Sequence, residues 1–285
     1  MKLVTDAFQH DGLTFVARGW TGEAPARTTL FIHHGLGEHG GRYETFARRL
    51  EGLPLDVWTY DARGHGESGG KRGHAMGLRQ LASDLHHLLP RLRERSGAER
   101  VIVMGHSMGA ATVATWATDA ELPGPPDWVR AIVLSAAPVN VPRTLEVRVK
   151  EVLARVLARV RPSFTMGSGL SAEGISSDPS EVRRYESDPL VHDRISAALG
   201  LSVLRDAPRV VERAGRIRLP TVMWHGTEDP IAAIAGSRDL FRSLGADDKL
   251  LHEFAGYRHE CHHETPERVT AMFELVRDWL EPHLA

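Results

Sequence analysis

Residues 101–111 read VIVMGHSMGAA, and this stretch indicates the fold of the chain more clearly than any other. Its pattern G-x-S-x-G follows an apolar run and opens a run of small residues that suits a helix. A strand, a tight turn and a helix in that order form a nucleophile elbow, which exposes a serine above a sheet. The turn strains the backbone of the serine and leaves no room for a Cβ atom at either glycine. We therefore expect Ser107 to stand at the N-terminus of a helix, where negative charge is favoured.

Further apolar runs lie on both sides of this motif, with helical patterns between them. The predicted strands are residues 29–33, 55–60, 101–104, 131–135, 221–225 and 249–254, and the predicted helices are residues 43–50, 78–95, 108–118, 233–244 and 266–283. The near-continuous apolar character of the strands favours a parallel sheet buried on both faces. The alternation predicts an α/β fold with a doubly wound sheet, whose sites lie at the carboxyl ends of the strands. Asp11-Gly12 predicts a hairpin, so we expect the sheet to start antiparallel.

The alternation stops between residues 137 and 216, which show no strand pattern. We interpret this segment as a helical cap, or lid, inserted into a core formed by residues 1–136 and 217–285. One helical face within the cap is apolar and ends at Pro162; it contains Leu145, Val149, Val152, Leu153, Val156, Leu157 and Val160. The opposite face contains Arg148, Lys150, Arg155 and Arg159. Either this helix packs on the core with its basic face in solvent, or it rests on an anionic membrane surface or opens onto a lipid substrate.

Composition and charge limit the class of protein. The chain has 285 residues and a net charge of −2, without the clustered basic surface of a nucleic-acid-binding protein, so no nucleic-acid partner is expected. Cys261 is the single cysteine, which excludes an intrachain disulfide and suits a small buried residue. No apolar run has the form of a signal peptide or the length of a membrane span. We expect a cytoplasmic protein, with peripheral contact to a membrane through the cap left open.

A serine hydroxyl is a weak nucleophile and needs a base that an acid orients. In folds with a nucleophile elbow, the acid and then the histidine follow the serine along the chain. Asp229 and His259 each follow one of the last two predicted strands, so both loops should lie at the same sheet edge as Ser107. Glu228 is an alternative acid, but Asp229 has the better offset from Gly226. The sequence therefore predicts a catalytic triad of Ser107, Asp229 and His259, which needs no metal or cofactor.

Residues 259–263 read HECHH, which also matches the zinc motif H-E-x-x-H. On a helix, this spacing lets two histidines bind zinc while the glutamate acts as a base. The segment begins only a few residues after a predicted strand, and the next helix is expected to start at Pro266 with Thr265 as its N-cap. We therefore expect a loop, with polar loop residues at His262, His263 and Glu264. A zinc metallohydrolase that uses this segment is the alternative of a different class.

The negative oxygen formed during ester hydrolysis needs hydrogen-bond donors. One predicted donor is the backbone N–H of Met108, which follows the nucleophile. The second is expected from the glycine-rich loop at residues 33–43, where the backbone N–H of Leu36 is the candidate. These two amides form the predicted oxyanion hole.

Six segments together resemble the monoacylglycerol lipase family of α/β-hydrolases, a group that overlaps with lysophospholipase-like and serine aminopeptidase S33-like hydrolases. They are HHGLGEHGGRY (33–43), YDARGHGESGGKRGH (60–74), GHSMGA (105–110), SDPLVH (187–192), HGTEDP (225–230) and GYRHE (256–260). The resemblance covers nearly the whole chain, in order, and implies an α/β-hydrolase fold with a helical cap. It also implies a serine carboxylic-ester hydrolase that releases fatty acid and glycerol from monoacylglycerols through an acyl-enzyme on Ser107.

The same resemblance implies the triad and the two oxyanion amides named above. It further implies that Glu38 and Arg42 line the site near the glycerol head group, although a salt bridge that shapes their loop is an equal alternative. A lysophospholipase or a broad-specificity carboxylesterase would share every one of these motifs. The partner that we expect is therefore a small lipid ester.

Overall fold

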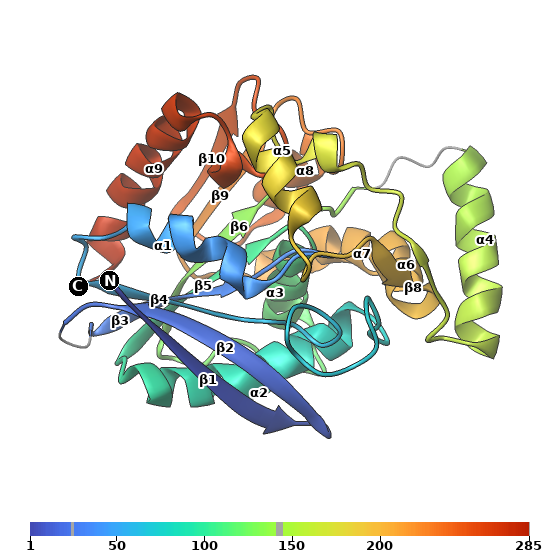
Figure 1. The fold of residues 1–285 in the computed structure, drawn as a ribbon, viewed down its shortest axis with the longest axis horizontal. Helices are drawn as coiled ribbons and strands as arrows, with labels where there is room; N and C mark the ends of the chain where they lie inside the picture. The colour runs from blue at the N-terminus through green and yellow to red at the C-terminus, as the bar shows by residue number, and fades with distance from the viewer. Residues whose placement is uncertain (24–25, 141–144, 285) are drawn as a thin grey trace.

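A sheet of eight strands runs through the centre of the part of the chain that the structure describes (Figure 1). The structure is a computed structural model that describes residues 1–23, 26–140 and 145–284, without the side chains of residues 145–150 and 153. The strands are β1 (Lys2–His10), β2 (Leu13–Thr21), β3 (Thr28–His33), β4 (Leu55–Tyr60), β5 (Arg100–His106), β6 (Val129–Ser135), β9 (Thr221–Gly226) and β10 (Lys249–Phe254). Their order is β1-β2-β4-β3-β5-β6-β9-β10, and only the pairs that include β2 are antiparallel. The predicted α/β class with a mostly parallel sheet is confirmed.

The antiparallel start of the sheet is a hairpin, as the sequence predicts. Asp11 and Gly12 have φ angles of 50° and 70°, the left-handed values that a two-residue hairpin turn requires. Asparagine, aspartate and glycine tolerate this conformation better than other residues. Strands β1 and β2 pair from Lys2 with Thr21 to His10 with Leu13.

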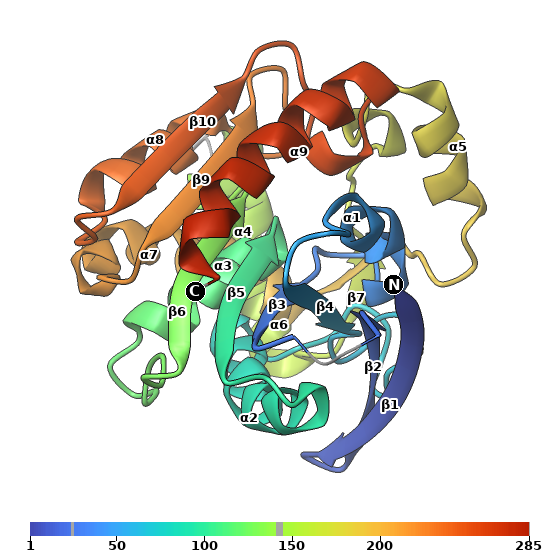
Figure 2. The ribbon, with the colours of Figure 1, turned by 90° about the vertical axis from the view of Figure 1, so that its left-hand side faces the viewer.

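Helices cover both faces of the sheet. One face carries α1 (Glu44–Arg49) and α9 (Pro266–Leu280), and the other carries α2 (Leu78–Ser96), α3 (Met108–Thr118), α7 (Ala207–Arg213) and α8 (Ile234–Ser243) (Figure 2). Phe46 and Met272 belong to the apolar cluster on the first face, whereas Leu85, Val113 and Leu240 belong to the cluster on the second. The amphipathic patterns of these helices thus bury two separate layers against one sheet.

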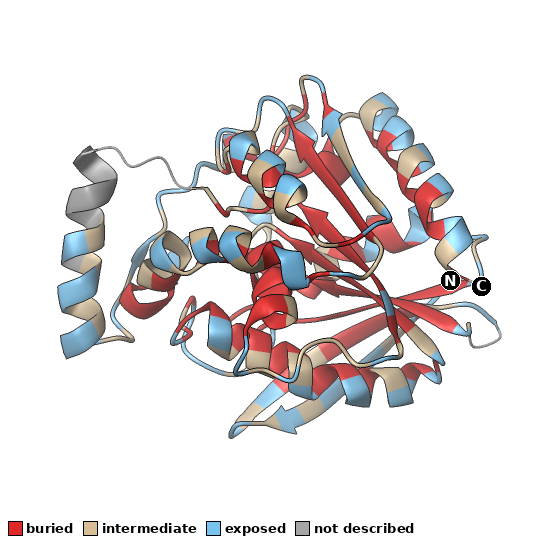
Figure 3. Cartoon of the chain, turned by 180° about the vertical axis from the view of Figure 1, so that it is seen from behind, coloured by how far each residue is buried: buried red, intermediate tan, exposed pale blue. Residues whose placement is uncertain are grey.

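The central strands are buried on both faces, and the last strand is not (Figure 3). Every residue of β3, β4 and β9 is buried. In β10 only Phe254 is buried, and Leu250 keeps 37% of its surface exposed. Residues 249–254 form a strand, as predicted, but the prediction that this strand is buried is wrong. It lies at the edge of the sheet, with a neighbouring strand on one side only.

The predicted cap contains more than helices. It holds α4 (Leu145–Val160), β7 (Thr165–Gly167), a 3-10 turn (Ala172–Gly174), α5 (Pro179–Ser187), β8 (Arg194–Ser196), α6 (Ala197–Arg205), α7 and a second 3-10 turn (Ala214–Arg216). Strands β7 and β8 pair antiparallel, so the expectation that this segment has no strand is wrong. Three residues are too few for a visible alternation of apolar and polar side chains. Val210 of α7 belongs to the core cluster with Val113, so the last helix of the segment packs on the core.

Helix α4 stands at one end of the molecule beside α6 (Figure 1). Val152, Val156 and Val160 of its apolar face are 58%, 55% and 79% exposed. The interpretation that this face packs on the core is therefore wrong for these three valines. Leu157 is half-buried, and Arg155 and Arg159 are exposed. The remaining members of the two predicted faces, Leu145, Arg148, Val149, Lys150 and Leu153, have side chains outside the described part of the chain.

Among the described helices, none is both long enough and apolar enough to cross a membrane.

Candidate active site

The predicted nucleophile elbow is present between β5 and α3. Ser107 has φ 52° and ψ −121°, a strained conformation for a residue with a side chain. A Cβ atom at Gly105 would lie 2.3 Å from the carbonyl oxygen of Gly109, and one at Gly109 would lie 2.1 Å from that of His33. Both glycines are therefore required by the close approach of strand and helix. The turn leaves Ser107 on the walls of two cavities.

The structure brings the predicted acid and base into contact. Asp229 follows β9 and His259 follows β10, and Asp229 Oδ2 lies 2.6 Å from His259 Nδ1. His225 Nε2 lies 2.9 Å from the same oxygen, while Asp229 Oδ1 accepts from the backbone N–H groups of Ile231 and Ala232. The side chain of Asp229 is fully buried, which suits an acid that orients a histidine.

The alternative acid Glu228 lies one residue away and is exposed. Its backbone N–H donates to the carbonyl oxygen of Tyr257. The contact with His259 is therefore made by Asp229.

The electrostatics of the Asp229–His259 pair favour charge separation. Burial by itself would raise the pKa of Asp229, but the charge of His259 and the hydrogen bonds from His225 and His259 hold that pKa well below its ordinary value. Burial would lower the pKa of His259, but Asp229 outweighs it and raises that pKa, with smaller contributions from Glu260 and Glu38. His259 therefore has an increased affinity for a proton beside a carboxylate that stays ionised.

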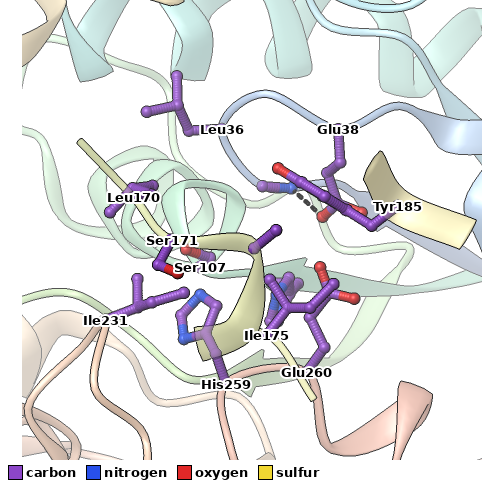
Figure 4. Close-up of a pocket in the computed structure, with 13 residues that line it drawn as sticks. Leu36, Glu38, Ser107, Leu170, Ser171, Ile175, Tyr185, Ile231, His259 and Glu260 are labelled. Atoms are coloured by element: carbon purple, nitrogen blue, oxygen red, sulfur yellow. Dashed lines mark hydrogen bonds between the residues drawn. The ribbon is translucent and has the colours of Figure 1, made fainter. Parts of the chain in front are cut away.

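Ser107 and His259 line the same small polar cavity (Figure 4). Because His259 Nδ1 contacts Asp229, Nε2 is the nitrogen left to reach Ser107. No hydrogen bond joins Ser107 and His259 in the described residues. Catalytic hydrogen bonds of ligand-free enzymes are often long and shorten when substrate binds.

Two cavities of different character meet at Ser107. The smaller, of about 30 Å³, has apolar residues such as Ile175 in its wall together with the polar or charged side chains of Glu38, His106, Tyr185, His259 and Glu260, and is called the polar cavity for these. The larger, of about 390 Å³, is lined mainly by apolar and small residues. Leu36, Ser107, Leu170 and Ile231 line both.

Burial is the main cause that lowers the pKa of His106 to about 4, and the neighbouring His259 lowers it further. His106 Nδ1 lies 3.0 Å from Ser135 Oγ. A neutral imidazole therefore stands in the wall of the polar cavity beside Ser107, the predicted nucleophile.

The two predicted oxyanion amides lie next to Ser107. Met108 is the first residue of α3, and Leu36 lies in the turn after β3. Within the described residues, neither N–H donates a hydrogen bond, and for Met108 this is usual because it lies in the first turn of a helix. Gly35 N–H donates to Glu38 Oε1 at 2.6 Å, and this bond bends the loop that carries Leu36.

Arg42 is held in a buried ion cluster. It donates to Glu38 Oε2 at 2.9 Å and to both carboxylate oxygens of Glu260 at 2.7 Å. Its guanidinium also lies 4.7 Å from the ring centre of Tyr185. The cavity wall includes Glu38 but not Arg42, which lies behind the two carboxylates.

Sequence reasoning missed Glu260, His106 and Tyr185 as cavity residues. Glu260 and His106 adjoin predicted triad residues in the chain, and that neighbourhood is the one signal that could have indicated them. Tyr185 comes from α5 in the predicted cap, and no local pattern points to it.

The HECHH segment does not form one helix. Cys261, His262 and His263 form a 3-10 turn, and α9 begins at Pro266 as predicted. Thr265 occupies the N-cap position, but its side chain makes no capping hydrogen bond. Cys261 is buried, as the sequence suggests.

His262 and His263 lie in the 3-10 turn and Glu264 follows it, so all three lie outside an α-helix as expected, and all three are buried. The ring of His262 stacks on Tyr43. His263 Nδ1 lies 2.7 Å from Glu260 Oε2, and Glu264 accepts from the backbone N–H of Arg258 at 2.7 Å. Contacts with Tyr43 and with residues of the same loop thus bury these side chains.

Two sets of side chains in the described residues bring metal-ligating atoms within 4.8 Å of one another. They are Glu260 with His262 and His263, and Glu38 with His106 and Glu260. Glu260 belongs to both sets and already accepts two hydrogen bonds from Arg42. Neither set contains His259, so the pair of histidines on which the zinc alternative rests does not converge on one site.

Main-chain hydrogen bonds join the cap to both loops that carry the predicted site. His259 N–H and Glu260 N–H donate to the carbonyl oxygens of Gly174 and Ile175, at 3.3 and 2.8 Å. On the other side, His192 N–H donates to Gly37 O at 2.8 Å. Segments of the cap thus pair directly with the histidine loop and with the loop of Leu36.

Comparison with known proteins gives consistent matches over the length of the chain. A family model described as serine aminopeptidase, S33 matches residues 24–266. A monoacylglycerol lipase of Mycolicibacterium smegmatis is 31% identical over 274 residues, which are 96% of this chain and 95% of the relative. A human monoglyceride lipase is 29% identical over 276 residues, or 96% and 89% of the two chains. The crystal structure of Paleococcus ferrophilus monoacylglycerol lipase matches with a TM-score of 0.81 and 34% identity, and covers 99% of this chain and 100% of that one.

Proposed function

This chain belongs to the serine aminopeptidase S33 family of α/β-hydrolases, and we propose that it is a monoacylglycerol lipase. It is a carboxylic-ester hydrolase, and its substrate and its catalytic residues are the proposed part. One observation carries the proposal: Ser107 lies where a large apolar cavity meets a small one whose wall includes charged and polar side chains. A monoacylglycerol has the same division, because its ester joins a long apolar chain to a glycerol that carries hydroxyl groups.

In the first half of the proposed reaction, His259 Nε2 takes the proton of Ser107 as Oγ attacks the ester carbonyl carbon. Asp229 keeps the other ring nitrogen protonated, and the 2.6 Å contact with His259 Nδ1 supports this role. The raised pKa of His259 suits a base that must hold the proton until the leaving group takes it. The amides of Leu36 and Met108 donate to the carbonyl oxygen as it becomes negative.

In the second half, the tetrahedral intermediate breaks its bond to the glycerol oxygen. That oxygen takes the proton from His259 and leaves as glycerol, while the acyl group stays on Ser107. Water then gives a proton to His259 and attacks the acyl carbon. The fatty acid leaves, and Ser107 Oγ recovers its proton. These steps use only water and groups of this chain.

The polar cavity favours glycerol over a phosphate-bearing head group. Its wall includes the carboxylates of Glu38 and Glu260, while one guanidinium, that of Arg42, pairs with both. Glycerol hydroxyls can donate to carboxylates, whereas the phosphate of a lysophospholipid would be repelled by them. In this proposal Glu38 contacts the head group, and Arg42 acts by holding Glu38 and Glu260 in place.

Contact with a membrane surface through α4 is part of the proposal. Val152, Val156 and Val160 present an exposed apolar stripe, with Arg155 and Arg159 exposed on the same helix. Apolar and basic side chains together on a surface helix favour the interface of an anionic bilayer. The substrate partitions into such a bilayer, so α4 would hold the protein where its substrate is.

Turnover of three ester classes tests the function: monoacylglycerol, lysophosphatidylcholine and p-nitrophenyl esters. We expect monoacylglycerol to react fastest, a fluorophosphonate to label Ser107, and Ser107→Ala to lose about 10⁶ in kcat. Faster turnover of lysophosphatidylcholine would support a lysophospholipase instead. Activity that survives Ser107→Ala and is lost with a chelator would support the zinc alternative.

A further inference from the structure

Gly200 lies inside helix α6, where the fold does not require a glycine. Glycine is less favourable than alanine in a helix interior, so its presence there needs a reason. A positive φ or a steric clash is the usual reason, and Gly200 has neither. Its φ is not positive, and an added Cβ atom would meet Ile195 Cδ1 at 3.6 Å and Cγ1 at 3.9 Å, both ordinary contacts.

The surroundings of Gly200 are those of the larger cavity. Gly200 lines the apolar cavity of about 390 Å³ and is not part of the polar cavity wall. The cavity face of α6 consists of Ala197, Gly200, Val203 and Leu204, at the spacing of one helical face. Ala154 of the neighbouring helix α4 lines the same cavity. Small side chains on these two helices thus keep space open that larger ones would fill.

We propose that Gly200 determines the length of acyl chain that the enzyme accepts. This inference rests on the proposed function only in taking the apolar cavity as the acyl site. A side chain at position 200 would occupy that cavity from the side of α6, and Gly200 does not line the smaller cavity that contains His259. Short acyl chains end before they reach α6, whereas the distal carbons of a long chain need the space beside Gly200.

The test is the chain-length profile of Gly200→Leu and Gly200→Ala on p-nitrophenyl butyrate, octanoate and palmitate. For Gly200→Leu we expect kcat/KM on palmitate to fall by about tenfold or more and that on butyrate to stay within about twofold. Gly200→Ala should give a smaller loss of the same kind together with a higher Tm, because alanine favours the helix. Gly215→Leu is the matched control, since Gly215 is exposed, has no positive φ and lines neither cavity, and an added Cβ there would meet only Ser243 O, at an ordinary 3.8 Å.

An unchanged profile in Gly200→Leu, or an equal loss on all three esters, would overturn this inference. If Gly200→Leu does not fold, a Gly200→Ala variant with a higher Tm and an unaltered profile would overturn it as well. The outcome is separable from that of the proposed function, because p-nitrophenyl esters contain no glycerol. If the wild-type protein cleaves the palmitate ester but no monoacylglycerol, the proposed substrate is wrong. The role of Gly200 is then decided by the same chain-length profile.

Discussion

Arg42 donates to both carboxylate oxygens of Glu260, at 2.7 Å each, in a buried ion pair that adjoins His259 in the chain. The charge of Glu260 is one of the causes that raise the pKa of His259. Removing it should therefore change the pH dependence of the reaction. In the proposed reaction His259 must be neutral to accept a proton, so activity should rise with pH through the pKa of this group.

Glu260→Gln should lower the pKa of His259 and move the acidic limb of the kcat/KM profile to lower pH. It should also lower the stability by about 3 kcal/mol or more, because it breaks a buried ion pair on one side. The pH profile and denaturant unfolding measure the two effects. Glu253→Gln is the control, since Glu253 pairs with Arg238 at the surface. A limb that stays in place or moves upward would contradict the electrostatic role of Glu260.

Asp229→Asn should reduce kcat by about 10⁴, because an amide no longer holds the His259 tautomer that accepts the serine proton. The neighbouring acid supplies the control: Glu228 is exposed, and Glu228→Gln should leave kcat nearly unchanged. Steady-state kinetics on a monoacylglycerol compares the two variants. A large loss in Glu228→Gln and none in Asp229→Asn would reverse the assignment of the acid.

Acid should destabilise the protein through its buried histidines. Burial is the main cause that lowers the pKa of His33 to about 3 and those of His34 and His106 to about 4. Below the unfolded value of about 6.5, the unfolded chain binds protons at these positions that the folded chain does not. Their contribution to stability is thus complete above that pH and is lost as the pH falls. His259 has a raised pKa and opposes this trend, but burial also lowers the pKa values of His65 and His262, so five buried histidines act against one.

The free energy of unfolding should therefore decrease by about 1 kcal/mol or more between pH 7 and pH 5. Urea unfolding at several pH values measures it. A free energy that is constant or larger at pH 5 would contradict the prediction.

The double variant Val156→Glu and Val160→Glu should weaken binding to anionic phospholipid vesicles by about tenfold or more, because two exposed apolar side chains would no longer enter the bilayer surface. Its turnover of a dissolved p-nitrophenyl butyrate should stay at the wild-type level. Co-sedimentation with vesicles is the measurement. Leu3→Glu is the control, as an exposed apolar residue on β1. If the wild type, the double variant and Leu3→Glu sediment equally with the vesicles, the proposed membrane contact of α4 is wrong.

The parts of the fold that follow from local chemistry could be predicted from the sequence. Gly105, Ser107 and Gly109 form a recognisable local motif for the elbow, and the clash that requires Gly105 arises within the turn itself, against the carbonyl oxygen of Gly109. Asp11 and Gly12 likewise predict their hairpin turn, because aspartate and glycine tolerate the positive φ angles that the turn requires. The fold class follows from the same kind of local signal, repeated along the chain.

Features that depend on distant contacts could not be predicted. Glu260 is buried because Arg42, far away in the chain, pairs with it. Glu264 is buried because Arg258 and cap residue Ser177 donate to it. The apolar pattern of α4 indicates a helix with two faces, but it does not indicate which face meets another part of the protein. Val160 therefore stands in solvent although its pattern matches that of a packed helix.

The pairing of Gly174 and Ile175 with the His259 loop, and of His192 with Gly37, restricts how this enzyme can be re-engineered. A hybrid protein that carries the cap of another hydrolase would need backbone groups that replace both sets of hydrogen bonds. Without them, the loops of His259 and Leu36 would no longer be held in place. Cap segments outside these pairings, α4 above all, are the parts that could be exchanged to change specificity while the proposed catalytic groups keep their positions.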